Sequence, residues 1–215
     1  MTKNHKIGAN VQNKIDKSVY LCQYVFMELF EDIVMNKKKQ LLIDTALSLF
    51  YKQGINSIGI NEVLNVSGVA KRTLYNHFES KEALIIAALE QRHQVFMEWL
   101  EEKLSSAQTC AEVIDQLFTA LNGWFHGSEE KLGEFRGCFF INTSAEFSDD
   151  SGEIATYCRY HKQQVRELIQ RYLKSDNASL LDAICIMKEG AITTAYMTKE
   201  YDNITKKCVT ILHKL

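Results

Sequence analysis

The sequence predicts an all-α protein, and two features of its composition and pattern lead to that expectation. The 215 residues include no proline and only ten glycines, whereas sandwiches and barrels depend on turns rich in both. Apolar residues recur at helical spacing through most of the chain. Only residues 137–141 resemble a strand, and their neighbours favour the start of a buried helix.

Four helices are expected within residues 37–103. The first begins at Lys37 and ends near Gly54, because glycine favours helix termination. A short second helix carries its apolar residues on one face and ends at the pair Ser67-Gly68, and a third covers residues 70–77. Ser80 then caps a long helix that extends to about residue 103.

Further helices are expected at residues 108–126, 129–136, 152–174, 177–198 and 201–214. Residues 1–35 differ from the rest, because their first half is polar and without a clear period. Met35 is followed by Asn-Lys-Lys-Lys, which is typical of a protein start. This N-terminal extension is therefore either an added helix or the product of a misplaced start codon, and the sequence leaves both open.

Charge is unevenly distributed along the chain. The net charge is −2, yet residues 36–84 contain seven Lys and Arg against four Asp and Glu, which gives +3. Residues 85–215 hold the balance of −5. A compact basic module ahead of an acidic remainder favours a partner with a negatively charged backbone.

The second and third expected helices are separated by a tight glycine turn, which is the arrangement of a helix-turn-helix. In that arrangement the second helix braces the third, whose outward side chains can then reach base edges in the major groove. The outward residues here are Lys71, Arg72, Thr73, Tyr75, Asn76 and His77. All carry hydrogen-bond donors, whereas phosphates and the major-groove atoms of guanine accept.

The same residues resemble a known family. Residues 49–84, with the core Gly-Val-x-x-x-Thr-Leu-Tyr-x-His-Phe-x-Ser-Lys-Glu beginning at Gly68, closely resemble the DNA-binding domain of the tetracycline-repressor (TetR/AcrR) family. The segment from Arg136 to Phe147 is similar to one found in a branch of that family. We therefore expect an N-terminal extension at residues 1–35, a DNA-binding domain at 36–84 and a ligand-sensing and dimerisation domain at 85–215.

The resemblance implies a cytoplasmic homodimer that binds a palindromic double-stranded operator as a repressor and leaves it when a small-molecule inducer binds. Lys71, Arg72 and Thr73 would face bases, while other residues would hold phosphates. The complete set of expected DNA-binding residues is Lys38, Gly59, Lys71, Arg72, Thr73, Tyr75, Asn76, His77 and Lys81. Gly59 and Ala70 depart from the family pattern, because a hydroxyl residue that caps the helix is frequent at both positions.

The second domain is expected to sense the inducer and to form the dimer. Its middle helices are rich in aromatic residues, which are typical of a core but can also line a pocket for a flat or apolar ligand. The candidate ligand-binding residues are Trp99, Phe118, Trp124, Phe147, Tyr157 and His161. The last two helices carry apolar stripes that either cover the subunit's own core or pair with a second copy, and a palindrome favours the dimer.

Cysteine chemistry provides one alternative. The six cysteines are scattered without a C-x-x-C pair or zinc-ligand spacing, so reduced thiols in the cytosol are expected. Cys158 and His161 lie three positions apart on one helix face but lack further ligands, so neither a metal nor a cofactor is expected. The alternative is a redox- or electrophile-responsive regulator that senses through a cysteine such as Cys138.

Other classes of protein fit the sequence less well. It contains no G-x-S-x-G, H-E-x-x-H or P-loop motif, so an enzyme is not expected. A DNA binder indifferent to sequence would rely mainly on electrostatics, whereas the polar third helix predicts preference for one palindrome. No apolar segment reaches the roughly 20 residues that a membrane span needs, and no signal peptide is present.

Overall fold

The computed structural model describes residues 34–147, 151–174 and 177–215. These residues form α-helices and one 3-10 turn, with no strand among them, which confirms the all-α prediction. The elements are a first helix at residues 34–53, α2 (Ile60–Ser67), α3 (Lys71–His77), α4 (Lys81–Leu104), α5 (Cys110–Phe125), η1 (Glu130–Leu132), α6 (Phe139–Glu146), α7 (Glu153–Leu173), α8 (Ala178–Thr198) and α9 (Tyr201–Leu212).

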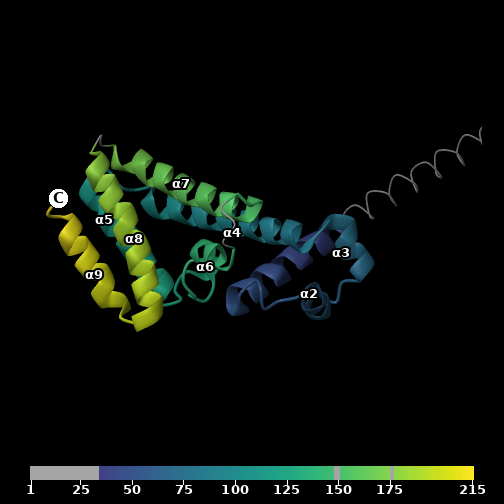
Figure 1. The fold of residues 1–215 in the computed structure, drawn as a ribbon. Coiled ribbons are helices and arrows are strands. Elements are labelled where there is room, and N and C mark those ends of the chain that lie inside the picture. The colour runs from purple at the N-terminus through teal and green to yellow at the C-terminus, as the bar shows by residue number, and fades with distance from the viewer. Residues whose placement is uncertain (1–33, 148–150, 175–176) are drawn as a thin grey trace, which may run out of the picture.

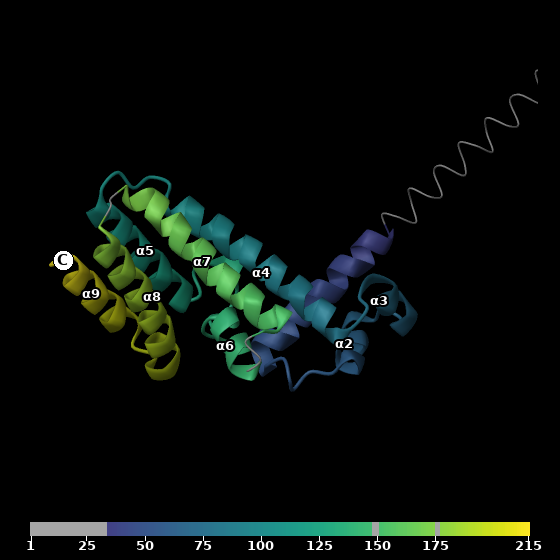
Figure 2. The same cartoon turned by 45° about the horizontal axis from the view of Figure 1, so that its top comes forward.

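The helices form two groups that share α4. The first helix, α2 and α3 lie at one end of the molecule, and α5, α8 and α9 lie at the other, while α4 and α7 run side by side between them (Figure 1). After rotation, α6 lies beside the first helix (Figure 2). The boundary expected between residues 84 and 85 falls in the first turns of α4. The N-terminal extension lies outside the described residues, apart from positions 34 and 35 of the first helix.

Local capping explains where the helices that position the site begin and end. Gly68 takes the left-handed conformation (φ 67°) and ends α2, which allows the sharp turn into α3. The Ser80 side chain accepts a hydrogen bond from the Ala83 backbone N–H, so the predicted cap of α4 is confirmed. Thr109 and Glu112 form a reciprocal capping box at the start of α5.

The prediction of a helix at residues 129–136 is wrong. Only Glu130–Leu132 forms a 3-10 turn, because Gly133 and Gly137 both take positive φ values (68° and 81°) that interrupt a helix. The Glu129 carboxylate instead accepts a hydrogen bond from Trp99 Nε1 at 2.8 Å. After Gly137 the chain enters α6 at Phe139, which confirms a helix start rather than a strand.

One hydrophobic core extends through both groups of helices. Leu42 and Leu74 are fully buried at one end, and Leu117 and Ile184 are fully buried at the other. Burying a large apolar side chain stabilises the fold by about 1.5–3 kcal/mol, so this continuous core holds the small helices firmly on α4. None of the described helices combines the length and apolar character that a membrane span requires.

Candidate nucleic-acid interface and sensor cavity

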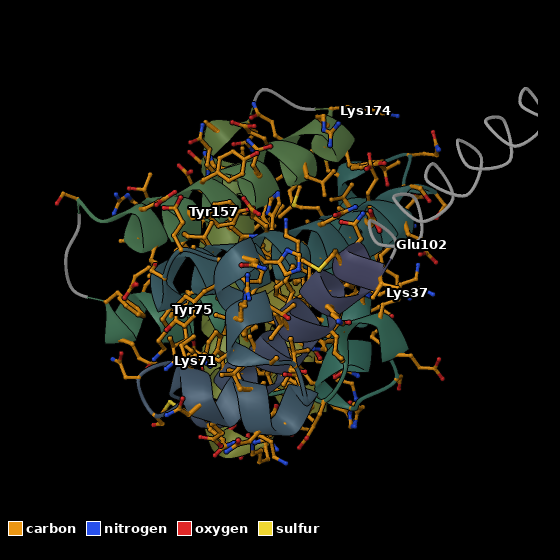
Figure 3. The ribbon with its side chains drawn as sticks, turned by 90° about the vertical axis from the view of Figure 1, so that its right-hand side faces the viewer. Lys37, Lys71, Tyr75, Glu102, Tyr157 and Lys174 are labelled. Atoms are coloured by element: carbon orange, nitrogen blue, oxygen red, sulfur yellow. The ribbon has the colours of Figure 1, made fainter. Side chains whose placement is uncertain are left out.

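Helix α3 presents a polar face away from the core. Its apolar side is anchored by Leu74, which is fully buried, and by Val69 and Phe78 at its two ends. On the opposite side Lys71, Arg72, Tyr75 and Asn76 are exposed, and Tyr75 retains 47% of its accessible surface. Figure 3 looks onto this end of the molecule and shows Lys71 and Tyr75 on it.

The outward side chains of α3 are unpaired within the part of the chain that the structure describes. Among the described residues, no hydrogen bond or ion pair joins the side chain of Lys71, Arg72, Tyr75 or Asn76 to another group. The Tyr75 ring likewise makes no ring contact with another aromatic or cationic side chain in the described ranges. These groups are therefore available to a partner outside the chain.

The remaining expected DNA-binding residues occupy different environments. Thr73 is half-buried and Lys38 is exposed. Lys81 donates a hydrogen bond to the Ile55 carbonyl at 2.7 Å, which leaves two of its three ammonium hydrogens free. The Nε2 atom of His77 is buried and has no hydrogen-bond partner within the described ranges. Burial and nearby Lys39 lower the pKa of His77, which favours its neutral ring.

The two helix caps that lack a hydroxyl are confirmed as open. Gly59 and Ala70 are the N-cap residues of α2 and α3, both in extended conformation, and neither side chain provides a capping hydrogen bond. A Cβ atom at Gly59 would meet nothing within 4 Å, so space does not require glycine there. The backbone N–H groups at the start of α2 are thus open to an anion.

The six candidate ligand-binding residues do not share one pocket. Trp99, Phe118 and Trp124 are each only 1% exposed and pack in the core, while Phe147 and Tyr157 are half-buried. Of the six, Trp124 and His161 line a closed cavity between α4, α5, α6, α7 and α8. The other cavity-lining residues are Arg92, Phe96, Cys138, Phe139, Phe140, Lys162, Lys188 and Ile192.

This cavity is small in the present state of the protein. Its volume is about 10 Å³, which is room for a single water molecule. His161 stacks on Phe140 with ring centroids 3.5 Å apart, and its Nδ1 lies 2.9 Å from that of His93. Burial lowers the pKa of His161, with help from nearby Lys162, so the ring is neutral.

Arg92 brings a buried positive charge to the cavity. The residue is 6% exposed, and its guanidinium lies over the rings of Tyr51 and Trp124 at 5.0 and 5.7 Å. Its Nη1 donates to the Leu132 carbonyl at 2.8 Å, whereas Nη2 is buried without a hydrogen-bond partner in the described part of the chain. No carboxylate among the described residues pairs with Arg92, and burial lowers its pKa.

Two lysines add further charge. Lys188 is 3% exposed and pairs with Glu189, which also pairs with Lys162 at 2.7 Å. Burial would raise the pKa of Glu189, but Lys188 and Lys162 outweigh burial and lower it to about 2. Lys162 Nζ also donates to Cys138 Sγ at 3.2 Å. Burial opposes the charge of Lys162, yet Cys138 and Glu189 raise its pKa above the usual value.

Helix α6 connects the cavity to the small helices. Its first residues line the cavity, and at its last residue the Glu146 carboxylate accepts hydrogen bonds from the backbone N–H groups of Ile55 and Asn56 at 2.9 and 2.6 Å. Ahead of α6, Tyr51 donates to the Gly137 carbonyl at 2.7 Å and accepts from the Arg136 N–H at 3.0 Å. Sequence reasoning missed these contacts, because their partners lie 85 to 91 positions apart.

An all-α chain in which a short exposed helix follows a bracing helix across a glycine turn is a helix-turn-helix protein. Residues 42–88 match the sequence profile of bacterial regulatory proteins of the tetR family. The match covers part of the first helix, α2, α3 and the start of α4, so this part of the chain is similar to that family. Within the described residues, no group of three or more His, Cys, Asp or Glu side chains is placed to hold a metal ion.

Curated relatives share this domain and, in part, the helical region after it. The HTH-type transcriptional repressor ComR of Escherichia coli is 26% identical over 132 residues, which is 61% of each chain. The uncharacterized HTH-type transcriptional regulator YerO of Bacillus subtilis is 43% identical over 56 residues, or 26% of this chain and 19% of YerO. The alignments thus span less than two thirds of these relatives.

Solved structures share the fold over most of the chain. A TetR-family transcriptional regulator from Streptomyces coelicolor gives a TM-score of 0.73 at 21% identity, covering 83% of this chain and 94% of that one. A TetR transcriptional regulator from Chloroflexus aurantiacus gives 0.70 at 21% identity, covering 83% and 93%. At this level of identity the similarity establishes the fold alone.

Proposed function

We propose that this chain is a cytoplasmic repressor that binds a palindromic operator as a homodimer and releases it when a small-molecule inducer binds. The observation that carries the proposal is the polar face of α3, whose four exposed side chains have no partner within the described residues. Base edges and phosphates offer the acceptors that these donors lack. The relatives named as transcriptional repressors support the same function.

Each group has a separate role in the proposed complex. Lys71, Arg72 and Thr73 face bases, and Tyr75 holds a phosphate. Lys38, the open N-terminus of α2 at Gly59 and the two free hydrogens of Lys81 add phosphate contacts. Contacts by Asn76 and His77 remain predictions, and the buried Nε2 of His77 must be uncovered before it can donate.

The dimer forms through α8 and α9. Ile186 and Met197 on α8 are 71% and 75% exposed, and Gly190 lies on the same stripe between them, which permits close approach of a second helix. Ile211 and Leu215 extend the apolar surface at the end of the chain. Two such helix pairs can form a four-helix bundle about a two-fold axis.

A charge on this stripe tests the dimer. We expect Ile186→Asp to convert the protein to a monomer in sedimentation velocity, because the carboxylate would be buried in the interface. Gln170→Asp places the same charge on an exposed position of α7 and is expected to leave the dimer intact. A dimer that survives Ile186→Asp would place the interface elsewhere.

Induction acts through α4 and α6. A ligand behind α4 would tilt that helix, and a ligand that displaces the start of α6 would also pull on the turn held by Glu146. A dimer must keep its two recognition helices about 34–36 Å apart to occupy successive major grooves. A small change in either helix is therefore enough to release the operator.

A cysteine sensor is the second candidate. Cys138 is buried with its Sγ atom 3.2 Å from the Lys162 ammonium, and a neighbouring cation is typical of reactive cysteines. One solved neighbour, E. coli NemR, was determined in a reduced form. If Cys138 is the sensor, alkylation or a disulfide-forming oxidant abolishes operator binding by the wild type but not by Cys138→Ser.

The decisive experiment is selection of bound DNA from a random duplex library with the purified full chain. We expect an inverted repeat, and we expect its recovery to be lost in the double variant Arg72→Ala, Tyr75→Phe. Circular dichroism and thermal melting of the variant serve as the folding control. Recovery of no preferred sequence by a folded dimer would overturn the proposed function.

A further inference from the structure

The cavity contains more positive than negative charge. Three cations line or approach it, namely Arg92, Lys162 and Lys188, and both lysines share the single carboxylate of Glu189. Arg92 has no carboxylate among the described residues. A buried and uncompensated charge is strongly unfavourable, so the protein maintains an arrangement that its own packing does not satisfy.

Two hydrogen-bond donors of the cavity-lining residues are also unsatisfied. Arg92 Nη2 and Trp124 Nε1 are both buried, and neither has a hydrogen-bond partner among the residues that the structure describes. Buried polar atoms in native proteins are nearly always paired, and an exception requires an explanation. Two unpaired donors and an excess of positive charge at one cavity together indicate an acceptor that carries negative charge.

Most of the remaining lining is apolar, and much of it is aromatic. Phe96, Phe139, Phe140 and Ile192 face the same cavity as the charged groups. A planar guanidinium binds a carboxylate through two parallel hydrogen bonds, and aromatic walls suit a planar ring. The lining therefore combines a site for a carboxylate with a site for an aromatic group.

We infer that this cavity binds a small aromatic carboxylate, with the carboxylate on Arg92 and Lys188 and the ring among the phenylalanines. The inference rests on the proposed function, because it names the chemical class of the inducer. The sequence predicts a flat or apolar ligand, and the inference adds a negative charge to that ligand.

The small volume of the cavity links binding to regulation. Room for one water molecule is too little for an aromatic ring, so the ligand must displace a wall. Phe139 and Phe140 belong to the first turn of α6, the helix whose last residue holds Ile55 and Asn56. Opening the cavity at this wall therefore moves α6, which is attached to the turn between the first helix and α2.

The test is thermal melting of the full chain with matched acid and amide pairs at constant ionic strength. The probes are benzoate against benzamide and 2-naphthoate against 2-naphthamide. We expect a carboxylate at about 100 times its Kd to raise the Tm by roughly 5–10 °C, and the amides to have little effect. Equal stabilisation by the amides, or none by either acid, would overturn the inference.

Variants locate the site. Lys188→Met and Arg92→Lys should each weaken carboxylate binding at least tenfold, measured by titration of the Tm shift, while Lys52→Met on the exposed face of the first helix should not. Arg92→Lys keeps the charge but removes the paired donors of the guanidinium. With two variants, the site can still be tested if one of them is unstable. Undiminished binding in both folded variants would place the ligand outside this cavity.

Operator binding is measured separately, which keeps the two proposals distinguishable. If the ligand-free chain selects an inverted repeat but no carboxylate binds, the inference fails and the repressor stands. If carboxylates bind in preference to amides without changing operator affinity, the site stands and the inducer role is overturned. If neither DNA nor carboxylate is bound by a folded dimer, both proposals fail.

Discussion

The exposed cations of α3 and the buried Arg92 of the cavity differ in the energetic consequence of having no anionic partner. Lys71 and Arg72 are solvated, so the absence of a protein partner has almost no energetic consequence. Arg92 is 6% exposed and has no carboxylate partner among the described residues, so the same absence is unfavourable for it. An exposed cation therefore needs its helix-turn-helix context before it indicates binding, whereas a buried cation without a counter-charge indicates a missing anion by itself.

The largest expected effect is on operator binding and comes from the exposed cations of α3. The double variant Lys71→Ala, Arg72→Ala should bind its selected operator at least about 100-fold more weakly, because a base contact contributes about 1–3 kcal/mol and the dimer makes each contact twice. Its free energy of unfolding should change by no more than about 0.5 kcal/mol. Fluorescence anisotropy at fixed salt and urea unfolding measure the two quantities.

The matched control for this effect is Lys52→Ala, which removes an exposed charge from the first helix. It should lower operator affinity only slightly, through long-range electrostatics that added salt screens. Equal losses in the control and the double variant would mean that α3 contributes charge but does not read sequence.

The next effect concerns Glu146, which joins the two regions. Glu146→Ala leaves the backbone N–H groups of Ile55 and Asn56 without their charged acceptor, so the free energy of unfolding should fall by about 1–3 kcal/mol. Glu167→Ala on the exposed face of α7 should cost no more than about 0.5 kcal/mol. Urea unfolding followed by circular dichroism compares them, and equal losses would show that Glu146 does not fasten α6.

A smaller effect tests the buried side. Lys188→Met removes a charge that shares Glu189 with Lys162, so ligand-free stability should stay constant or rise by about 1 kcal/mol. Lys52→Met should remain within about 0.5 kcal/mol of the wild type. Thermal melting without ligand is the measurement. A large loss of stability would instead show that Lys188 is a structural partner of Glu189. Its charge would then be compensated and would not contribute to the excess positive charge of the cavity.

Short-range sequence signals such as helix caps predict the helix-turn-helix well, but they predict the cavity poorly. Ser80 and Gly68 act over a single turn, so the sequence is sufficient to place α3 and α4. Arg92 lies four positions after Ala88 and four before Phe96, which puts a charge on the apolar face of α4. That spacing is visible in the sequence, but only the packing of five helices shows that no carboxylate faces the charge among the described residues.

The aromatic residues show a second limit of prediction from sequence. The aromatic pattern predicts a ligand contact for Trp99 and Phe118, but the structure places both in the packed core, each 1% exposed. Composition cannot distinguish an aromatic wall from an aromatic core, because both bury the same surface. The distinction arises from contacts between distant segments, such as that of Trp99 with Glu129.

The smallest expected effect returns to α3. Ala70 is its N-cap residue in extended conformation and provides no side-chain hydrogen bond. Ala70→Ser should supply that acceptor and raise the free energy of unfolding by about 0.5–1 kcal/mol. Urea unfolding measures the gain, with Ala145→Ser at an exposed position inside α6 as the control that should give none. Because the cap orders the helix that carries Lys71 and Arg72, operator affinity should rise or stay constant. A gain in stability accompanied by weaker DNA binding would indicate that α3 must loosen at its start to enter the groove.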